Sequence, residues 1–261
     1  MMEFLEGIPP LILLAAVMLI GLVPTTAVLL YVRRHRSVEH MRREHDVVGA
    51  TFTVIGALYG VLLAFLVMAV AQQYGATLMY CEQEGNALAN LHRDSYGLPP
   101  AVQVPVRQAL IDYARAVVRD EWPQLKFRRD SERAHEAMDR IWLQFRGVNP
   151  GTEAEKIWFQ SCVDRVNELA GLRRLRILAS QDTLSWVMWV LLIAGGVITI
   201  GYMNFFAVEK VRSHLILTIS LAGLIVLILF IVYLFDNPFW GDPHIEPTSF
   251  LRFLARHPTP E

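Results

Sequence analysis

The sequence lacks several features that would place it in a familiar soluble class. It has only two cysteines in 261 residues, Cys81 and Cys162, too few for a disulfide scaffold, and neither lies in a metal-binding pattern. Its net charge of -1 gives no overall attraction to nucleic acid. In an oxidising compartment the two cysteines are able to pair, whereas in the cytoplasm we expect buried free thiols.

The chain also lacks any recognised catalytic pattern. It contains no phosphate-binding loop, no HExxH zinc motif and no nucleophile elbow. We therefore expect no enzymatic activity, no cofactor and no metal centre. His45 and Asp46 follow His40 closely, which permits a metal site. The interpretation that fits better is Asp46 as the N-cap of a helix beside an interfacial histidine.

Charged side chains are absent from the interior of four long apolar segments. The chain is 54% hydrophobic and 19% charged, a mixture typical of a membrane protein with a sizeable polar part. A helix needs about 20 apolar residues to cross a bilayer. Residues 10–32, 47–70, 184–206 and 215–235 meet this requirement. Because acidic Glu3 and Glu6 precede the first segment and no small-residue cleavage site follows it, we expect a retained helix.

These segments predict an all-α membrane protein with four transmembrane helices in two pairs. We assign the helix pairs to residues 10–70 and 184–235, a helical polar insert to residues 72–182, and a C-terminal tail to residues 236–261. Beyond Val70 only the weak breaker Gly75 interrupts the helical pattern, so the second membrane helix is expected to continue to about Leu91. The last helix of the insert is expected to run into the third membrane helix in the same way.

The insert shows helical periodicity throughout. One face carries Val106, Leu110, Tyr113 and Val117, and another carries Val163, Val166, Leu169 and Leu172. A helix stop is expected at Trp122–Pro123 and a helix start after Ser131, while Thr152 and Glu155 form a capping box. The apolar faces pack either within one subunit or between subunits, and the charged residues are expected to form solvated helix faces.

Basic residues gather in the two short loops that join the paired membrane helices. These residues are Arg33, Arg34, Arg36, Arg42, Arg43, Lys210 and Arg212. The insert starts with acidic Glu82 and Glu84. By the positive-inside rule the short loops are cytoplasmic, and the insert and both termini are periplasmic. Three arginines just before the third helix, Arg173, Arg174 and Arg176, favour the opposite orientation.

The second membrane helix carries small residues at intervals of three or four. Thr53, Gly56, Gly60 and Ala64 fall on one face, and GALYG is a GxxxG pattern. Small residues allow close helix packing, which is one interpretation. In the other, this face borders a pore whose hydrophobic constriction gates by dewetting. The absence of intramembrane charge argues against an ion-coupled pump.

A helix stop follows the fourth membrane segment directly, in the motif DNPFWGD. Pro238 disfavours helical geometry at the residue before it, and Gly241 permits a tight turn. The aromatic residues Phe239 and Trp240 are expected to anchor the chain at the membrane interface. The flanking acids, Asp236 and Asp242, are expected to face water or a cation.

Five motifs along nearly the whole chain resemble a bacterial family of bestrophin-like membrane proteins. They are EHDVVGATFTVIGALYGVLLAF, EGNALANLHRDSYGLP, ARAVVRDEWP, RRLRIL and DNPFWGD. The resemblance implies a multi-pass protein of the bacterial cytoplasmic membrane. More distantly, the helix order and the Asn-Pro-Phe turn resemble bestrophins, which are pentameric anion channels whose second membrane helix lines a pore with a hydrophobic neck.

By resemblance, therefore, the chain is a homo-oligomer in the lipid bilayer, pentameric like bestrophins, that conducts chloride or other small anions. In animal members an acidic run after the last helix helps to bind calcium; here PHIEP follows the turn, so no calcium site is implied. Small residues stand where the neck of bestrophins carries bulky ones. Bestrophins keep the insert and both termini in the cytoplasm, opposite to the charge-based orientation, and both orientations stay open.

Two functions from different classes fit the sequence. The first is an oligomeric anion channel with Thr53, Gly56, Gly60 and Ala64 along its pore. The second is a membrane-anchored scaffold or sensor whose helical insert binds a protein partner. A substitution of Gly56 by leucine separates them, because it alters conductance in a channel and leaves partner binding intact in a scaffold.

Overall fold

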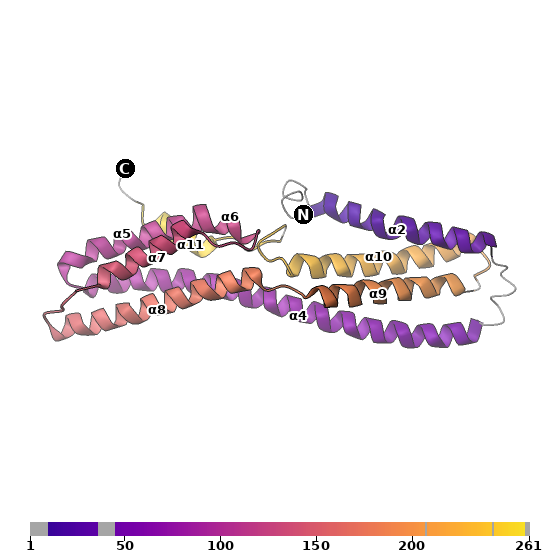
Figure 1. Ribbon diagram of the computed structural model, residues 1–261, viewed down its shortest axis with the longest axis horizontal. Helices are drawn as coiled ribbons and strands as arrows, with labels where there is room; N and C mark the ends of the chain where they lie inside the picture. Colours follow the sequence, from indigo (N-terminus) through magenta and orange to yellow (C-terminus); the bar gives the residue numbers. More distant parts are fainter. Residues whose placement is uncertain (1–9, 36–44, 207, 242, 259–261) are drawn as a thin grey trace. The chain divides into compact units, whose positions relative to one another are not determined.

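The computed structural model describes residues 10–35, 45–206, 208–241 and 243–258. Within these ranges the chain is helical and has no strand, which confirms the predicted all-α class (Figure 1). In chain order the elements are α2 (Pro10–His35), α4 (His45–Asp94), the 3-10 turn η1 (Ser95–Gly97), α5 (Pro100–Ala116), the π-helix η2 (Val117–Glu121), α6 (Trp122–Leu125), α7 (Glu132–Phe145), α8 (Glu153–Gln181), α9 (Trp186–Tyr202), the 3-10 turn η3 (Met203–Phe205), α10 (Val211–Phe235) and α11 (Thr248–Arg256). Of the residues singled out above, Glu3, Glu6, Arg36, His40, Arg42, Arg43 and Asp242 lie outside the described residues.

The described chain divides into two compact units. The membrane unit comprises the described residues up to 72 together with residues 184–236. The insert unit comprises residues 73–183 together with the described residues from 237 onward. Helix α4 contributes to both units as one continuous helix of 50 residues. It ends at Asp94, which confirms the predicted continuation of the second membrane helix to about Leu91.

Four helices are long and apolar enough to cross a membrane, as the sequence predicts. They span Leu11–His35, Asp46–Gly97, Trp186–Phe205 and Val211–Phe235. Within the membrane unit α2 lies along α10, and α10 packs against α9 (Figure 1). Helix α2 continues through Pro24, and the Thr25 hydroxyl donates to Gly21 O at 2.7 Å, so a local side chain bonds a backbone carbonyl beside the proline.

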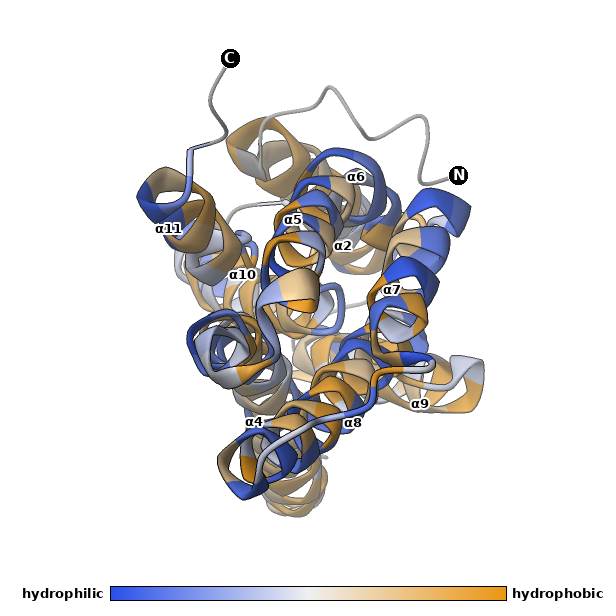
Figure 2. Ribbon diagram, turned by 90° about the vertical axis from the view of Figure 1, so that its left-hand side faces the viewer, coloured by the Kyte–Doolittle hydropathy of each residue, from blue (hydrophilic) through white to orange (hydrophobic). Residues whose placement is uncertain are grey.

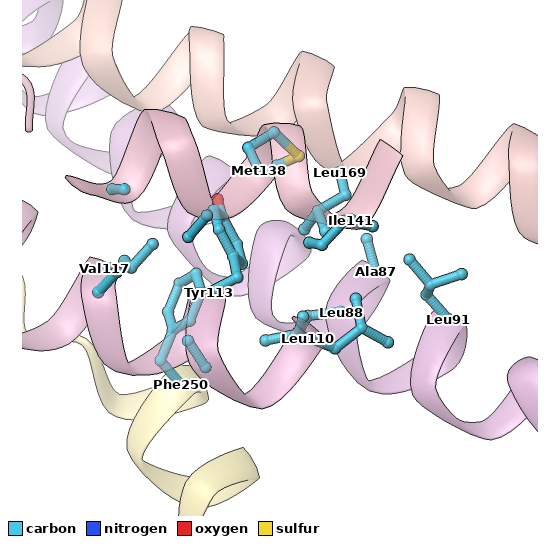
Figure 3. Packing of buried hydrophobic residues seen from close by; sticks show 14 of the residues in the cluster. Ala87, Leu88, Leu91, Leu110, Tyr113, Val117, Met138, Ile141, Leu169 and Phe250 are labelled. Atoms are coloured by element: carbon cyan, nitrogen blue, oxygen red, sulfur yellow. The ribbon is translucent and has the colours of Figure 1, made fainter. Parts of the chain in front are cut away.

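The insert unit has its own hydrophobic core. Figure 3 shows side chains of α4, α5, η2, α7, α8 and α11 converging there, among them Ala87, Leu88, Leu91, Leu110, Tyr113, Val117, Met138, Ile141, Leu169 and Phe250. Helices such as α7 have a hydrophobic and a hydrophilic side (Figure 2). The amphipathic helices of the insert therefore pack within one chain, and the C-terminal helix α11 belongs to the same core.

The helix boundaries confirm three predictions and correct two. Helix α7 begins after Ser131, the Thr152–Glu155 capping box starts α8, and α10 ends before the proline turn. The helix predicted to stop at Trp122–Pro123 does not end there. It continues from η2 into α6, because proline is tolerated in the first turn of α6. Nor does α8 run into α9. Asp182 is extended, and Ser185 accepts a bond from the Met188 amide as the N-cap of α9.

Candidate functional site

The small residues of α4 form an open face on the membrane unit. Thr53, Gly60 and Ala64 are exposed, and Gly56 is half-buried. Within the described part of the chain, a Cβ atom added at Gly56 or Gly60 would meet no atom within 4 Å. The Thr53 hydroxyl donates to Gly49 O of its own helix at 2.9 Å. The four predicted residues therefore share a face, and the GxxxG pattern does not serve helix packing within the protomer.

The opposite face of α4 is packed. Tyr59, Leu63, Leu66 and Val70 belong to a buried cluster with residues of α9 and α10. The Tyr59 hydroxyl donates to Leu192 O at 2.8 Å, and the Tyr59 ring rests on Gly195 and Gly196 of α9. The glycines therefore allow close packing of α4 on α9 at Gly195 and Gly196. At Gly201 an added Cβ atom would have no neighbour within 4 Å.

Bulky apolar side chains flank the small residues on the open side of α4. Leu58 and Phe65 are about two-thirds exposed, and Val54, Val61 and Met68 are more than half exposed. From Val47 to Ala71 the helix carries no charged residue. The exposed side of α4 is therefore apolar and uncharged over this range, with small residues beside bulky ones.

The predicted polar residues at the mouth of α4 lie in its first turn. The helix begins at His45, and Asp46 is exposed within the first turn. Asp46 therefore lies inside the helix. The prediction that it is the N-cap residue before the helix is wrong. A carboxylate in this position still interacts favourably with the positive end of the helix dipole.

The turn after α10 differs from its prediction in two ways. Asp236 is buried and accepts a hydrogen bond from the Leu184 amide at 2.7 Å, so it caps a chain segment and does not face water. Phe239 and Trp240 are buried, and Phe239 packs edge-on against Trp122 inside the insert unit instead of anchoring at the interface. The chain turns back after Pro238, whose carbonyl accepts the Ile245 amide at 2.8 Å, and Gly241 adopts the left-handed conformation with φ 82°.

A second polar site lies inside the insert and was missed from the sequence. Glu84 of α4, Glu121 of η2, and Arg173 and Arg176 of α8 are all buried and bonded to one another. Arg176 Nε donates to Glu84 Oε2 and Arg176 Nη2 donates to Glu121 Oε1, each at 2.6 Å. Arg173 donates to both carboxylate oxygens of Glu121. The Tyr113 hydroxyl donates to Glu84 Oε1 at 2.6 Å.

The electrostatics of this cluster favour the charged form of Glu121 and the neutral form of Tyr113. Burial alone would raise the pKa of Glu121, but the Arg176 and Arg173 guanidinium groups hold that pKa below its usual range. Burial and the nearby Glu84 carboxylate raise the pKa of Tyr113 well above 10, so its hydroxyl stays protonated. Two acids and two arginines balance each other, so these four buried residues depart from the expectation that the charges of the insert form solvated faces.

One signal in the sequence points toward this cluster. Arg173 and Arg176 are three positions apart and lie on the face that continues the apolar stripe of Val166, Leu169 and Leu172. Charged residues in register with a buried stripe need buried partners. Their partners, 52 to 92 positions away in the chain, are not readable from one sequence.

Both the sequence and the fold of the chain are similar to known proteins. The model of the Bestrophin-like domain family matches residues 20–250. Two crystal structures of a bacterial bestrophin homologue from Klebsiella pneumoniae, each with one mutation, have a TM-score of 0.68 at 10% and 9% identity, over 92% of this chain and 96% of theirs. A crystal structure described as a membrane protein has a TM-score of 0.62 at 10% identity over 95% of both chains. At this identity the likeness shows a shared fold. No curated protein matches the chain.

Proposed function

Because the chain belongs to the bestrophin-like family, as its motifs predict, we propose that it forms an oligomeric anion channel whose pore is lined by α4. The observation that supports the proposal is the open face of α4. Thr53, Gly60 and Ala64 are exposed there, and a Cβ atom at Gly56 or Gly60 would meet no atom of the described residues within 4 Å. One chain offers a single wall, so a closed pore requires several copies arranged around an axis. Five copies is the number implied by the resemblance to bestrophins.

In this channel the uncharged wall of α4 controls passage. The glycines leave the lumen wide, and the flanking Leu58 and Phe65 are available to narrow it when the helix rotates. A narrow apolar segment expels water and stops ions without any charged gate. The permeant species in this proposal are chloride and other small anions, and the protein resides in the bacterial cytoplasmic membrane.

Ion flux into liposomes tests the proposal. Purified protein is reconstituted under separate chloride and potassium gradients and compared with empty vesicles. We expect chloride-selective flux that Gly56→Leu alters. Gly171→Leu in α8 of the insert is the matched control, because a Cβ at Gly171 also meets no atom within 4 Å. Background-level flux for the wild type across varied pH and calcium, or identical flux for both variants and the wild type, would contradict the proposed pore.

A scaffold or sensor remains the second candidate, and one surface of the insert favours it. Tyr96, Ile157 and Trp158 expose apolar area, and the Trp158 ring packs so closely on Gly97 that a Cβ there would overlap it. Exposed aromatic residues are common at protein interfaces. Protein capture by the wild type that is lost with Trp158→Ala, in a protein without flux, would favour this function.

A further inference from the structure

The membrane unit carries a long groove between α2, α9 and α10. Its volume is about 740 Å³, within the range of about 300–1,000 Å³ that small-molecule sites occupy. Along α2 it extends from Leu13 to Val28, a rise of about 22 Å at 1.5 Å per residue. The lining is almost wholly apolar, with Val17, Ile193, Val197, Leu229 and Phe230 among its residues. The groove therefore has the length and the chemistry of a site for an extended hydrocarbon chain.

The position of the groove decides which medium it meets. Its lining residues come from α2, α9, η3 and α10, so it is a different surface from the open face of α4. All three long helices are membrane-spanning by length and composition. An apolar concavity in a bilayer is therefore bordered by lipid, and leaving it empty would forfeit dispersion contacts along its whole length.

One polar side chain at the end of the groove, among the described residues, has an oxygen atom without a hydrogen-bond donor. Asn204 of η3 lines the groove and is 8% exposed. Its Nδ2 donates to Gly201 O at 3.1 Å, which fixes the amide orientation because a carbonyl only accepts. Among the described residues, its Oδ1 is buried and has no hydrogen-bond partner. A buried acceptor of this kind requires a donor, and because Asn204 lines the groove, a donor placed there is able to supply the missing hydrogen bond.

Basic residues lie at the same end of the membrane unit. Arg33 Nη2 donates to the carbonyls of Val208 and Glu209 at 2.8 and 3.0 Å, which places the last turn of α2 against the segment that follows η3. Exposed cations on these elements are Arg34, Lys210 and Arg212, with Glu209 as the exposed acid. Cations at the end of a membrane helix attract lipid phosphate.

We infer that the groove binds one acyl chain of a phospholipid whose headgroup carries an O–H or N–H donor. The chain lies along α2 toward Leu13, the donor satisfies Asn204 Oδ1, and the phosphate lies near the basic residues that end α2 and begin α10. Phosphatidylethanolamine and phosphatidylglycerol supply such donors, whereas phosphatidylcholine has the phosphate without one. The inference needs a membrane protein but does not need ion permeation.

Native mass spectrometry of the full-length protein tests this site. The protein is purified from nanodiscs of each of the three lipids, and the phospholipid retained per protomer is counted. We expect retention of phosphatidylethanolamine or phosphatidylglycerol to exceed that of phosphatidylcholine by up to about tenfold, the scale of one hydrogen bond. Asn204→Leu should remove this headgroup preference, because only the contact with the acyl chain remains.

Two substitutions on α9 separate the groove from its surroundings. Gly201→Leu places a side chain in the groove, where a Cβ meets no atom within 4 Å, and should abolish retention of all three lipids. Ile198→Leu, at a half-exposed position outside the lining, should leave retention unchanged. Undiminished lipid in Gly201→Leu would overturn the inference. So would a Gly201→Leu protein that loses its oligomeric state, because the groove would then hold a second copy. Flux measured on the same samples reports on the pore separately.

Discussion

Arg176 and Glu84 lie 92 positions apart in the sequence, yet Arg176 Nε donates to Glu84 Oε2 at 2.6 Å and both side chains are fully buried. Arg176 also bonds Glu121, so one guanidinium links α4, η2 and α8. A buried ion pair of this kind adds little net stability compared with an apolar core. Its removal on one side is costly, because the remaining charge stays buried without compensation.

Arg176→Met should therefore destabilise the protein strongly. The change leaves Glu84 without its ion-pair partner and Glu121 with only Arg173, and we expect a loss of about 3–5 kcal/mol. The unfolding temperature in detergent, followed by circular dichroism, measures this loss. The exposed neighbour Arg174 is the matched control, and Arg174→Met should be nearly neutral. Equal unfolding temperatures for the two variants would show that the buried network is dispensable.

Stability should fall in acid through Glu121. Since the pKa of this carboxyl is lower in the folded than in the unfolded chain, its contribution is present above the unfolded value of about 4.3 and disappears as the pH drops through the folded value. Glu121→Gln should lower stability at neutral pH and flatten the acid limb between about pH 5 and pH 3. Unfolding temperatures measured across this range give the comparison. An acid limb as steep in the variant as in the wild type would assign the acid sensitivity to other carboxyls.

Two glycines of the membrane unit should respond oppositely to alanine. At Gly195 a Cβ atom would lie 2.5 Å from Tyr59 Cδ2, so Gly195→Ala should cost about 1–3 kcal/mol through overpacking. At Gly60 the Cβ meets nothing, so Gly60→Ala should be neutral or stabilise the helix by up to about 1 kcal/mol. Unfolding temperatures in the same detergent rank the variants. A larger loss at Gly60 would mean that α4 packs closely against another copy at this position.

The two cysteines should be unreactive in the folded protein. Both are buried free thiols in the insert unit, and burial raises the pKa of Cys162 to about 12. Thiolate is the reactive form, so maleimide at about pH 7.5 should modify neither thiol until the protein is denatured. Labelling is counted by mass spectrometry before and after denaturation, and electrophoretic mobility should not change on reduction. Modification of Cys162 in the native state would show that the insert opens.

The side of the membrane that holds the insert is testable through the same chemistry. Ala154 is exposed at the start of α8, and Ala154→Cys adds a reactive thiol beside two shielded ones. The charge pattern predicts a periplasmic insert, so a membrane-impermeant maleimide should label this variant in intact cells. The wild-type protein, which has only the two shielded cysteines, is the control. Labelling only after lysis would place the insert in the cytoplasm, as the resemblance to bestrophins implies.

Most of the helices could be predicted from the sequence, because apolar residues recur along them at helical spacing. The continuation of α4, the Thr152 cap and the stripe of Val106, Leu110, Tyr113 and Val117 follow from local residues alone. Contacts between distant segments did not follow from the sequence. From the sequence, Asp236 is expected to be a solvated acid in a turn, but in the structure it bonds the Leu184 amide. Glu121 is expected on the surface, but it bonds Arg173 of α8 in the interior of the insert unit. The shared face of the small residues of α4 could be predicted from their spacing. That no described segment of the protomer packs closely on Gly56 and Gly60 could not be predicted from the sequence.

The open glycines of α4 also bear on protein engineering. A helix glycine costs up to about 1 kcal/mol relative to alanine, and at Gly56 and Gly60 nothing within the described protomer is gained in return. A thermostabilisation procedure that scores isolated chains would therefore replace these two glycines early. Its products would melt later and, in the proposed assembly, would carry a methyl group on every subunit at the surface where the ions pass.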